Sequence, residues 1–72
     1  MNKLVAELDL LRRVADVSMS EVCRKAGLRK ETLSDWRREK YGPTLANFEA
    51  AVNALGFRLA ILPLPIEKEG QP

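Results

Sequence analysis

The sequence predicts an all-α fold, a compact bundle of four to five short helices, followed by a C-terminal β-strand. Apolar residues recur at helical spacing in several short segments, and capping residues and glycines separate these segments. A β-compatible run then follows the last of the separating glycines. With 72 residues the chain allows one small domain. We divide it into a helical domain over residues 1–56, an arm over 57–66 and a flexible polar tail over 67–72.

Two helices are predicted in the first part of the chain. Asn2 is placed to cap a helix to about Ala15, with one apolar face: Leu4, Leu8, Leu11 and Ala15. Ser18-Met19-Ser20-Glu21 has the pattern of a capping box, in which each side chain bonds the other residue's amide. A second helix of about eight residues therefore follows Ser18, and Gly27 ends it, because a helix C-terminus favours a left-handed residue there.

Two further helices are predicted in the remainder of the domain. The third runs from Arg29 or Lys30 to about Arg38, and it turns Leu33 and Trp36 inward. A turn at Tyr41-Gly42-Pro43 follows, in which we expect Gly42 to supply the positive φ. The fourth helix is capped by Thr44 and ended by Gly56, and its apolar positions are Leu45, Phe48, Val52 and Leu55.

The composition argues against an enzyme. The chain has one cysteine and no histidine, so it lacks an internal disulfide, a structural zinc site and any Ser-His or Cys-His pair. Its four glycines stand apart and form no phosphate-binding loop. We expect no catalysis, no cofactor and no metal, and we expect Cys23 to be buried. A domain this small is marginal alone, which favours a partner subunit.

The charge distribution favours a polyanionic partner. The formal net charge is +2, but residues 21–41 hold seven Lys and Arg against four Asp and Glu, a local net charge of +3. We find no targeting segment, and the apolar stretch Leu55–Ile66 is too short to span a bilayer. A cytoplasmic protein without membrane contact is expected.

The segment from Ser18 to Arg38 resembles the helix-turn-helix of the Cro and phage-repressor family, the small XRE-like transcriptional regulators. The residues that carry the resemblance are Ser18, Glu21, Val22, Cys23, Ala26, Gly27, Leu28, Thr32, Leu33 and Trp36. Further matches, to the family's Pro-Thr-Leu turn and closing Ala-Leu-Gly, are Pro43, Thr44, Leu45, Phe48, Ala54, Leu55 and Gly56. The resemblance implies a DNA-binding domain over residues 1–56 whose third helix enters the major groove of double-stranded DNA.

The resemblance also implies the contact residues. By position in the motif, base contacts are expected from Lys30, Glu31, Ser34 and Asp35. Phosphate contacts are expected from Met19, Ser20, Arg29, Thr32, Arg37, Arg38 and Thr44. Lys30 would donate to guanine, and Glu31 or Asp35 would accept from cytosine. Trp36, in contrast, is expected in the core. The chain departs from the family at Arg29, where a capping Ser or Thr is usual, and at Arg37, where Glu is usual.

The run Phe57–Leu64 reads as a strand that Pro63 and Pro65 terminate. A strand on a helical domain has no sheet to join, so we expect it to pair with a second copy of the chain. The dimerisation residues would be Phe57, Leu59, Ile61 and Leu62. The alternative is an arm that packs back on its own core. A dimer would read a near-palindromic operator with two recognition helices one DNA turn apart.

The leading hypothesis is a dimeric, autoregulating transcriptional repressor of phage or operon type, controlled through its own concentration. A second hypothesis is an antitoxin that binds a toxin protein and represses its own operon, which a toxin-like neighbouring gene would favour. A third is a protein-interaction module without a DNA role. Salt separates the third from the others, because affinity for DNA phosphates falls steeply with salt.

Overall fold

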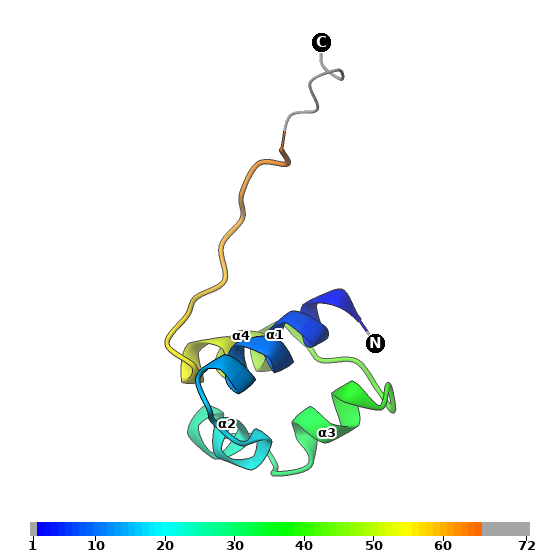
Figure 1. The fold of residues 1–72 in the computed structure, drawn as a ribbon. Coiled ribbons are helices and arrows are strands. Elements are labelled where there is room, and N and C mark those ends of the chain that lie inside the picture. Colours follow the sequence, from blue (N-terminus) through cyan, green and yellow to red (C-terminus); the bar gives the residue numbers. More distant parts are fainter. Residues whose placement is uncertain (1, 66–72) are drawn as a thin grey trace.

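The computed structural model describes residues 2–65, which form four α-helices and an extended arm (Figure 1). The helices are α1 (Lys3–Val14), α2 (Met19–Ala26), α3 (Thr32–Arg37) and α4 (Leu45–Ala54). α2 packs against α3 and α4, and α1 packs against α3. The arm, residues 57–65, leaves the end of α4 and runs away from the bundle on the side opposite α2 and α3. The predicted helical bundle is confirmed.

The core is small and draws on all four helices. The buried apolar side chains among residues 2–65 are Val5, Leu8, Val22, Cys23, Leu33, Trp36, Phe48, Ala51 and Val52. Trp36 of α3 and Phe48 of α4 form a tilted aromatic pair with ring centroids 6.2 Å apart. Both Trp36 and Cys23 are buried, as the sequence predicted. With so few core residues, the position of each helix depends on a few contacts and on polar links at the surface.

Side-chain caps start three of the helices at the predicted residues. Asn2 Oδ1 accepts from the Leu4 amide at 2.7 Å, and Thr44 Oγ1 accepts from the Asn47 amide at 3.1 Å. Ser18 Oγ accepts from the Glu21 amide at 3.1 Å, which is half of the predicted capping box. The reciprocal half is absent, because the Glu21 carboxylate instead accepts from Arg24 Nε at 3.0 Å. That hydrogen bond lowers the pKa of Glu21 below its ordinary value.

Every helix of the described chain ends on a residue with left-handed backbone. These residues are Asp16 (φ 60°), Gly27 (φ 75°), Glu39 (φ 60°) and Gly56 (φ 87°). In each case the next amide donates to a carbonyl five residues back, with Leu28 N to Cys23 O at 2.8 Å as an example. The two glycine ends were predicted. The expectation for Gly42 was wrong, because the chain reverses after α3 at Glu39.

α3 is shorter than predicted, since it starts at Thr32 and not at Arg29 or Lys30. Lys30 and Glu31 form a turn in front of it. Glu31, at the cap position, already has helical backbone angles and makes no side-chain cap. An arginine at position 29 has no acceptor with which to cap the helix start. The first turn is therefore closed by the backbone alone, with the Thr32 amide 3.0 Å from Arg29 O.

The inward face of α1 is rotated relative to the prediction. Val5, Leu8 and Asp9 are buried, whereas Leu4 and Ala15 are exposed. Leu4, Leu8 and Leu11 do share a face, but it is turned toward the arm, where these residues line a groove. The predicted apolar face of α1 therefore lies between the core and the arm.

The predicted strand is not confirmed, because residues 57–65 have no regular secondary structure. Leu59 packs against the core, while Ile61, Leu62 and Leu64 extend into solvent. Among residues 2–65 this extended segment has no second strand with which to form a ladder. The alternative of an arm packed on its own core therefore fits Leu59 only. Residues 66–72, including the predicted tail, lie outside the described residues.

Candidate nucleic-acid interface

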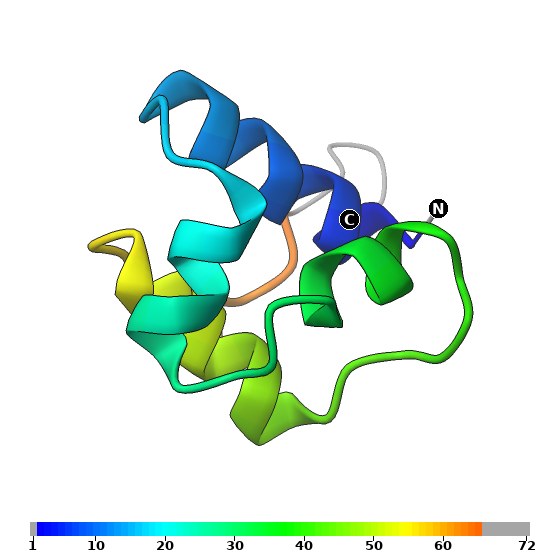
Figure 2. The same ribbon diagram turned by 90° about the horizontal axis from the view of Figure 1, so that it is seen from below.

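α2, α3 and the turn between them form a helix-turn-helix unit. Gly27 reverses the chain after α2 in the left-handed conformation, and Leu28 packs against the core as the chain turns. α2 and α3 then cross steeply, with a short connection (Figure 2). Val22 and Cys23 of α2 and Leu33 and Trp36 of α3 are buried in the shared core. Within α3 four residues are buried, and Ser34 and Arg37 are half-buried. The exposed turn before the helix, residues 29–31, and Ser34 remain at the surface, and we call these residues the open side of α3.

Three of the four predicted base-contact residues lie on the open side of α3. Lys30 and Glu31 are exposed in the turn before the helix, and Ser34 is half-buried in its first turn. Lys30 and Glu31 directly precede the helix turn that carries Ser34. The structure thus brings a donor, an acceptor and a hydroxyl together at one end of α3. These are side-chain types that read base edges in the major groove.

Asp35, the fourth predicted base contact, lies inside the protein with 4% of its surface exposed. Its Oδ1 accepts from Arg38 Nη2 at 3.0 Å, and its Oδ2 accepts from the Tyr41 hydroxyl at 3.3 Å. Arg29 Nη2 lies 3.9 Å from Oδ2 and 3.4 Å from the Tyr41 oxygen. The four residues, which we call the Asp35 cluster, link the turn before α3 to the loop after it. Tyr41 was expected only as part of the turn after α3, and not as a partner of Asp35.

The Asp35 cluster favours the charged form of its carboxyl group. The hydrogen bond from Arg38, and then the one from Tyr41, lower the pKa of Asp35 below its ordinary value against the opposing effect of burial. Asp35 therefore remains an anion at neutral pH, with both oxygens engaged by the protein.

The predicted phosphate contacts separate into two groups. Ser20, Arg29, Arg38 and Thr44 are exposed, and the Arg29 and Arg38 side chains keep about 70% of their surface accessible. Met19 and Arg37 are half-buried, and Thr32 is buried. The Thr44 hydroxyl oxygen already caps α4 by accepting from the Asn47 amide. The exposed group includes the two arginines that precede and follow α3.

Arg37 belongs to a second polar cluster, centred on Asp9, that the sequence did not reveal. Asp9 of α1 accepts from Arg12 Nε at 2.8 Å and pairs with Arg13 at 3.1 Å. Arg37 Nε of α3 lies 3.6 Å from Asp9 Oδ2, and its Nη1 lies 3.8 Å from the Met19 sulfur. Arg12 also donates to Val17 O at 3.2 Å. The Asp9 cluster therefore links α1, α3 and the start of α2.

The spacing of Asp9, Arg12 and Arg13 was the available signal for this cluster. Opposite charges at i, i+3 and i+4 pair on a helix. That pairing is usual at a solvated surface, and the burial of Asp9 depends on the rotation of α1, which the apolar stripe indicated incorrectly. Arg37 was therefore predicted as a phosphate contact, although it faces α1.

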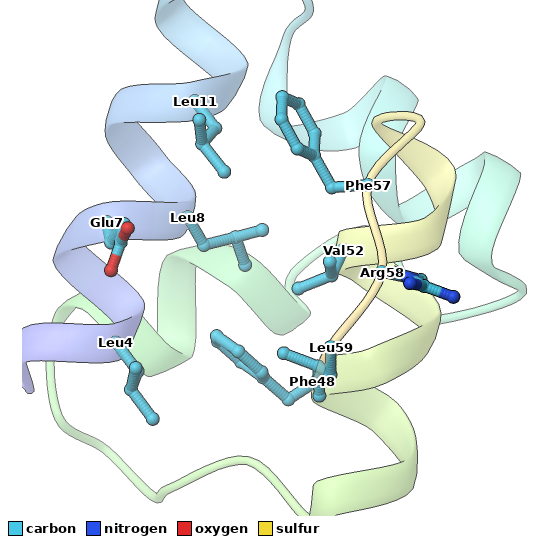
Figure 3. Close-up of a pocket in the computed structure, with 9 residues that line it drawn as sticks. All are labelled: Leu4, Glu7, Leu8, Leu11, Phe48, Val52, Phe57, Arg58 and Leu59. Carbon is cyan, nitrogen blue, oxygen red and sulfur yellow. The ribbon is translucent and has the colours of Figure 1, made fainter. Parts of the chain in front are cut away.

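A groove lies between α1, α4 and the arm, with a volume of about 200 Å³. Figure 3 shows Leu8 and Leu11 of α1 facing Phe57 and Val52 across it, while Arg58 points away. A second groove adjoins it and is lined by Leu4, Leu45, Phe48, Glu49, Leu59, Ala60 and Ile61. All four predicted dimerisation residues, Phe57, Leu59, Ile61 and Leu62, lie on the arm beside these grooves or just beyond them.

Two other kinds of site are not seen in residues 2–65. No helix in this part of the chain has the length and apolarity to cross a membrane. No group of three or more Cys, Asp or Glu within it is placed to hold a metal ion.

The fold and the open side of α3 define a small helix-turn-helix DNA-binding domain. Residues 6–62, from α1 into the arm, match a transposase helix-turn-helix family, and the chain belongs to that family. This supports the helix-turn-helix that the sequence analysis inferred, but it does not single out the Cro and phage-repressor family. No curated protein and no solved structure matches the chain.

Proposed function

We propose that this protein is a non-enzymatic transcriptional regulator that binds double-stranded DNA sequence-specifically and represses its own gene as a dimer. The observation that supports this most is the open side of α3, which presents Lys30, Glu31 and Ser34 at the end of a helix-turn-helix unit. Exposed Arg29 precedes α3 and exposed Arg38 follows it, so candidate phosphate ligands lie at both ends of this helix.

The proposed contacts follow from the exposed chemistry. Lys30 donates to guanine O6 and N7, and Glu31 accepts from the cytosine amino group. Ser34 bonds to either kind of base edge, because a hydroxyl both donates and accepts. Arg29 and Arg38 bind DNA phosphates. Ser20 and the main-chain amides around Thr44 make further phosphate contacts. Asp35, Thr32 and Arg37 stay outside this proposed contact set, because the fold covers or engages them.

Dimerisation through the arm is the second part of the proposal. Ile61 is fully exposed, and Leu62 and Leu64 are at least three-quarters exposed, beside a groove whose walls include exposed Leu4 and Leu45. Monomeric proteins seldom expose apolar patches above roughly 300–600 Å². A second copy supplies both an arm to pair with and an apolar surface to cover. Because the arm leaves on the side opposite α2 and α3, pairing leaves the α3 surface free (Figure 1).

The DNA-binding proposal is tested by fluorescence anisotropy with the duplex upstream of the protein's own gene and a scrambled duplex of equal length. We expect affinity for the native duplex to exceed that for the scrambled one by about 10³ or more, with a steep loss as salt rises. Equal and weak binding to both duplexes would contradict autoregulation. Binding that ignores salt would contradict the phosphate contacts.

Sedimentation equilibrium tests the arm. The paired change Ile61→Asp and Leu62→Asp places two charges on the exposed part of the arm and keeps Leu59 in place. We expect it to convert a dimer to a monomer and to weaken operator binding. Leu10→Asp is the control, because Leu10 is also an exposed apolar residue but lies on α1 outside both grooves. A variant that still sediments as the dimer would rule out pairing through the arm.

The family match favours a second candidate function, the binding of DNA at the ends of a mobile element. The same α3 surface would serve it, so the structure of the site does not separate the two functions. Selection of bound sequences from a pool of random duplexes separates the two functions. A consensus that maps upstream of the gene supports the regulator, and one that maps to the terminal repeats of a mobile element supports this second candidate.

The apolar arm keeps the antitoxin hypothesis open as a variant of the first proposal. In that case the arm binds a toxin in place of, or together with, a second copy. Co-expression with the neighbouring gene and co-purification test it. A stable complex that the Ile61→Asp, Leu62→Asp change disrupts would support the antitoxin role, and separate elution of the two proteins would oppose it.

A further inference from the structure

The Asp35 carboxylate lies between two exposed arginines that come from opposite ends of α3. The Asp35 side chain is 6% exposed, whereas those of Arg29 and Arg38 are 71% and 68% exposed. Arg29 precedes the helix and Arg38 follows it. One terminal nitrogen of each guanidinium lies within 4 Å of this single carboxylate. A carboxylate covered to this extent is poorly placed to reach a base edge.

Tyr41 connects Arg29 to the carboxylate. Arg29 Nη2 is 3.9 Å from Asp35 Oδ2, which is too long for a hydrogen bond. The Tyr41 hydroxyl bridges the two, since it accepts from Arg29 at 3.4 Å and donates to Oδ2 at 3.3 Å. Arg38 needs no bridge, because its Nη2 donates directly to Oδ1 at 3.0 Å.

Each guanidinium has five N–H donors and directs only part of them at the Asp35 cluster. The remaining donors belong to side chains that are largely exposed. A long side chain that is already held by a neighbour loses less rotational freedom when it binds a ligand. Two arginines fixed at their tips therefore form a more effective pair of phosphate ligands than two free ones.

We propose that Asp35 is a positioning residue for DNA binding: it holds Arg29, through Tyr41, and Arg38 in the orientation that binds backbone phosphates. This inference rests on the proposed DNA-binding function and replaces the base contact that the sequence had suggested for Asp35. It assigns a function to Tyr41 as well.

The inference predicts an effect opposite in sign to simple electrostatics. A negative charge near DNA repels phosphates, so its removal alone strengthens binding. Asp35→Asn removes one such charge but also weakens the attachment of both arginines. Positioning therefore predicts weaker binding by this variant, whereas a carboxylate that merely stabilises the fold predicts stronger binding once the variant is folded.

The experiment measures the affinity of each variant for a random-sequence duplex, so that no operator needs to be known. Glu31→Gln is the matched control, since it removes an exposed acid from the turn directly before α3. We expect Glu31→Gln to bind this duplex more tightly than the unaltered chain. We expect Asp35→Asn to bind it roughly 5- to 10-fold more weakly, the cost of immobilising two freed arginines. Tyr41→Phe, with no change in charge, should weaken binding by about half that factor or less.

A second readout isolates the positioning role. In a chain that already carries Arg29→Gln and Arg38→Gln, Asp35 has nothing left to position, so the added Asp35→Asn change should strengthen binding. Circular dichroism and thermal unfolding establish that each variant is folded. If Asp35→Asn is not folded, Tyr41→Phe decides the question: weaker binding supports the inference and unchanged binding overturns it.

Tighter binding by folded Asp35→Asn, as for Glu31→Gln, would overturn the inference while leaving the proposed function intact. The failure of the unaltered chain to bind any duplex would overturn both. The two results are therefore distinct, and neither depends on the regulated gene.

Discussion

Gly27 has the left-handed backbone that joins α2 to α3, and no atom lies within 4 Å of the position that a Cβ would take. The cost of a side chain at Gly27 is therefore conformational and not steric. We predict that Gly27→Ala lowers the free energy of unfolding by about 1–2 kcal/mol, as expected for an L-residue in this region. Urea denaturation measures it. Gly42→Ala is the control, because Gly42 has open space but no positive φ, and an equal loss there would contradict the explanation.

Asp35 gives the protein a defined dependence on pH. Its pKa is lower in the folded chain than in the unfolded one, so the folded state binds the proton less readily. The resulting stabilisation is complete above the ordinary carboxyl pKa of about 3.9 and is lost as the pH falls through the folded value. We predict that the difference in melting temperature between the unaltered chain and Asp35→Asn is constant from pH 5 to 7 and shrinks below about pH 4. A difference that persists unchanged in stronger acid would contradict this assignment.

At single positions, the sequence indicated the apolar core better than it indicated the depth of polar side chains. Lys30 and Glu31 were predicted at the surface of the motif and are there, and Trp36 was predicted in the core and is there. Asp35 was predicted as a base contact from its position in the motif. That position gives a residue's place along the helix, but it does not indicate whether its side chain is buried. Its burial depends on Arg29 and Tyr41, which lie six residues away on either side and come together only in the fold.

α1 is fastened to α3 through the Asp9 cluster, which supplements a small apolar contact. We predict that Asp9→Ala lowers the free energy of unfolding by about 1.5–3 kcal/mol, because it removes a charged hydrogen bond and leaves a largely buried Arg12 without its carboxylate. Glu7→Gln is the control, an exposed acid of the same helix that should change stability by less than about 0.5 kcal/mol. Chemical denaturation of both variants decides it, and equal losses would contradict a specific role for Asp9.

Most helix boundaries were predictable from single residues, and the start of α3 was the exception. Asn2, Ser18 and Thr44 cap their helices through their own side chains, so the residue type alone predicts the helix start. Gly27 and Gly56 likewise predict helix ends. Asp16 and Glu39 adopt the same left-handed backbone although they are not glycines. The tertiary fold imposes that conformation on them. The strand predicted in the arm was not confirmed for a related reason, since a ladder needs a second strand and the described part of the chain has none.

The stability of the whole molecule should depend on protein concentration if the arm joins two copies. Association stabilises the folded state by mass action, whereas a monomer unfolds at a temperature independent of concentration. We predict that the melting temperature rises over a 100-fold increase in protein concentration, and that the Ile61→Asp, Leu62→Asp variant loses this rise. A constant melting temperature in the unaltered chain would contradict the dimer.

The central claim is that the open side of α3 is the DNA-binding surface. The most direct test is an amide chemical-shift map of the ¹⁵N-labelled chain titrated with duplex DNA. The structure predicts the largest shifts at residues 19–20 and 29–38, with smaller shifts near Thr44 and little change at 59–65. Shifts concentrated on the arm and on the grooves beside Leu4 and Leu45, with α3 unaffected, would contradict it.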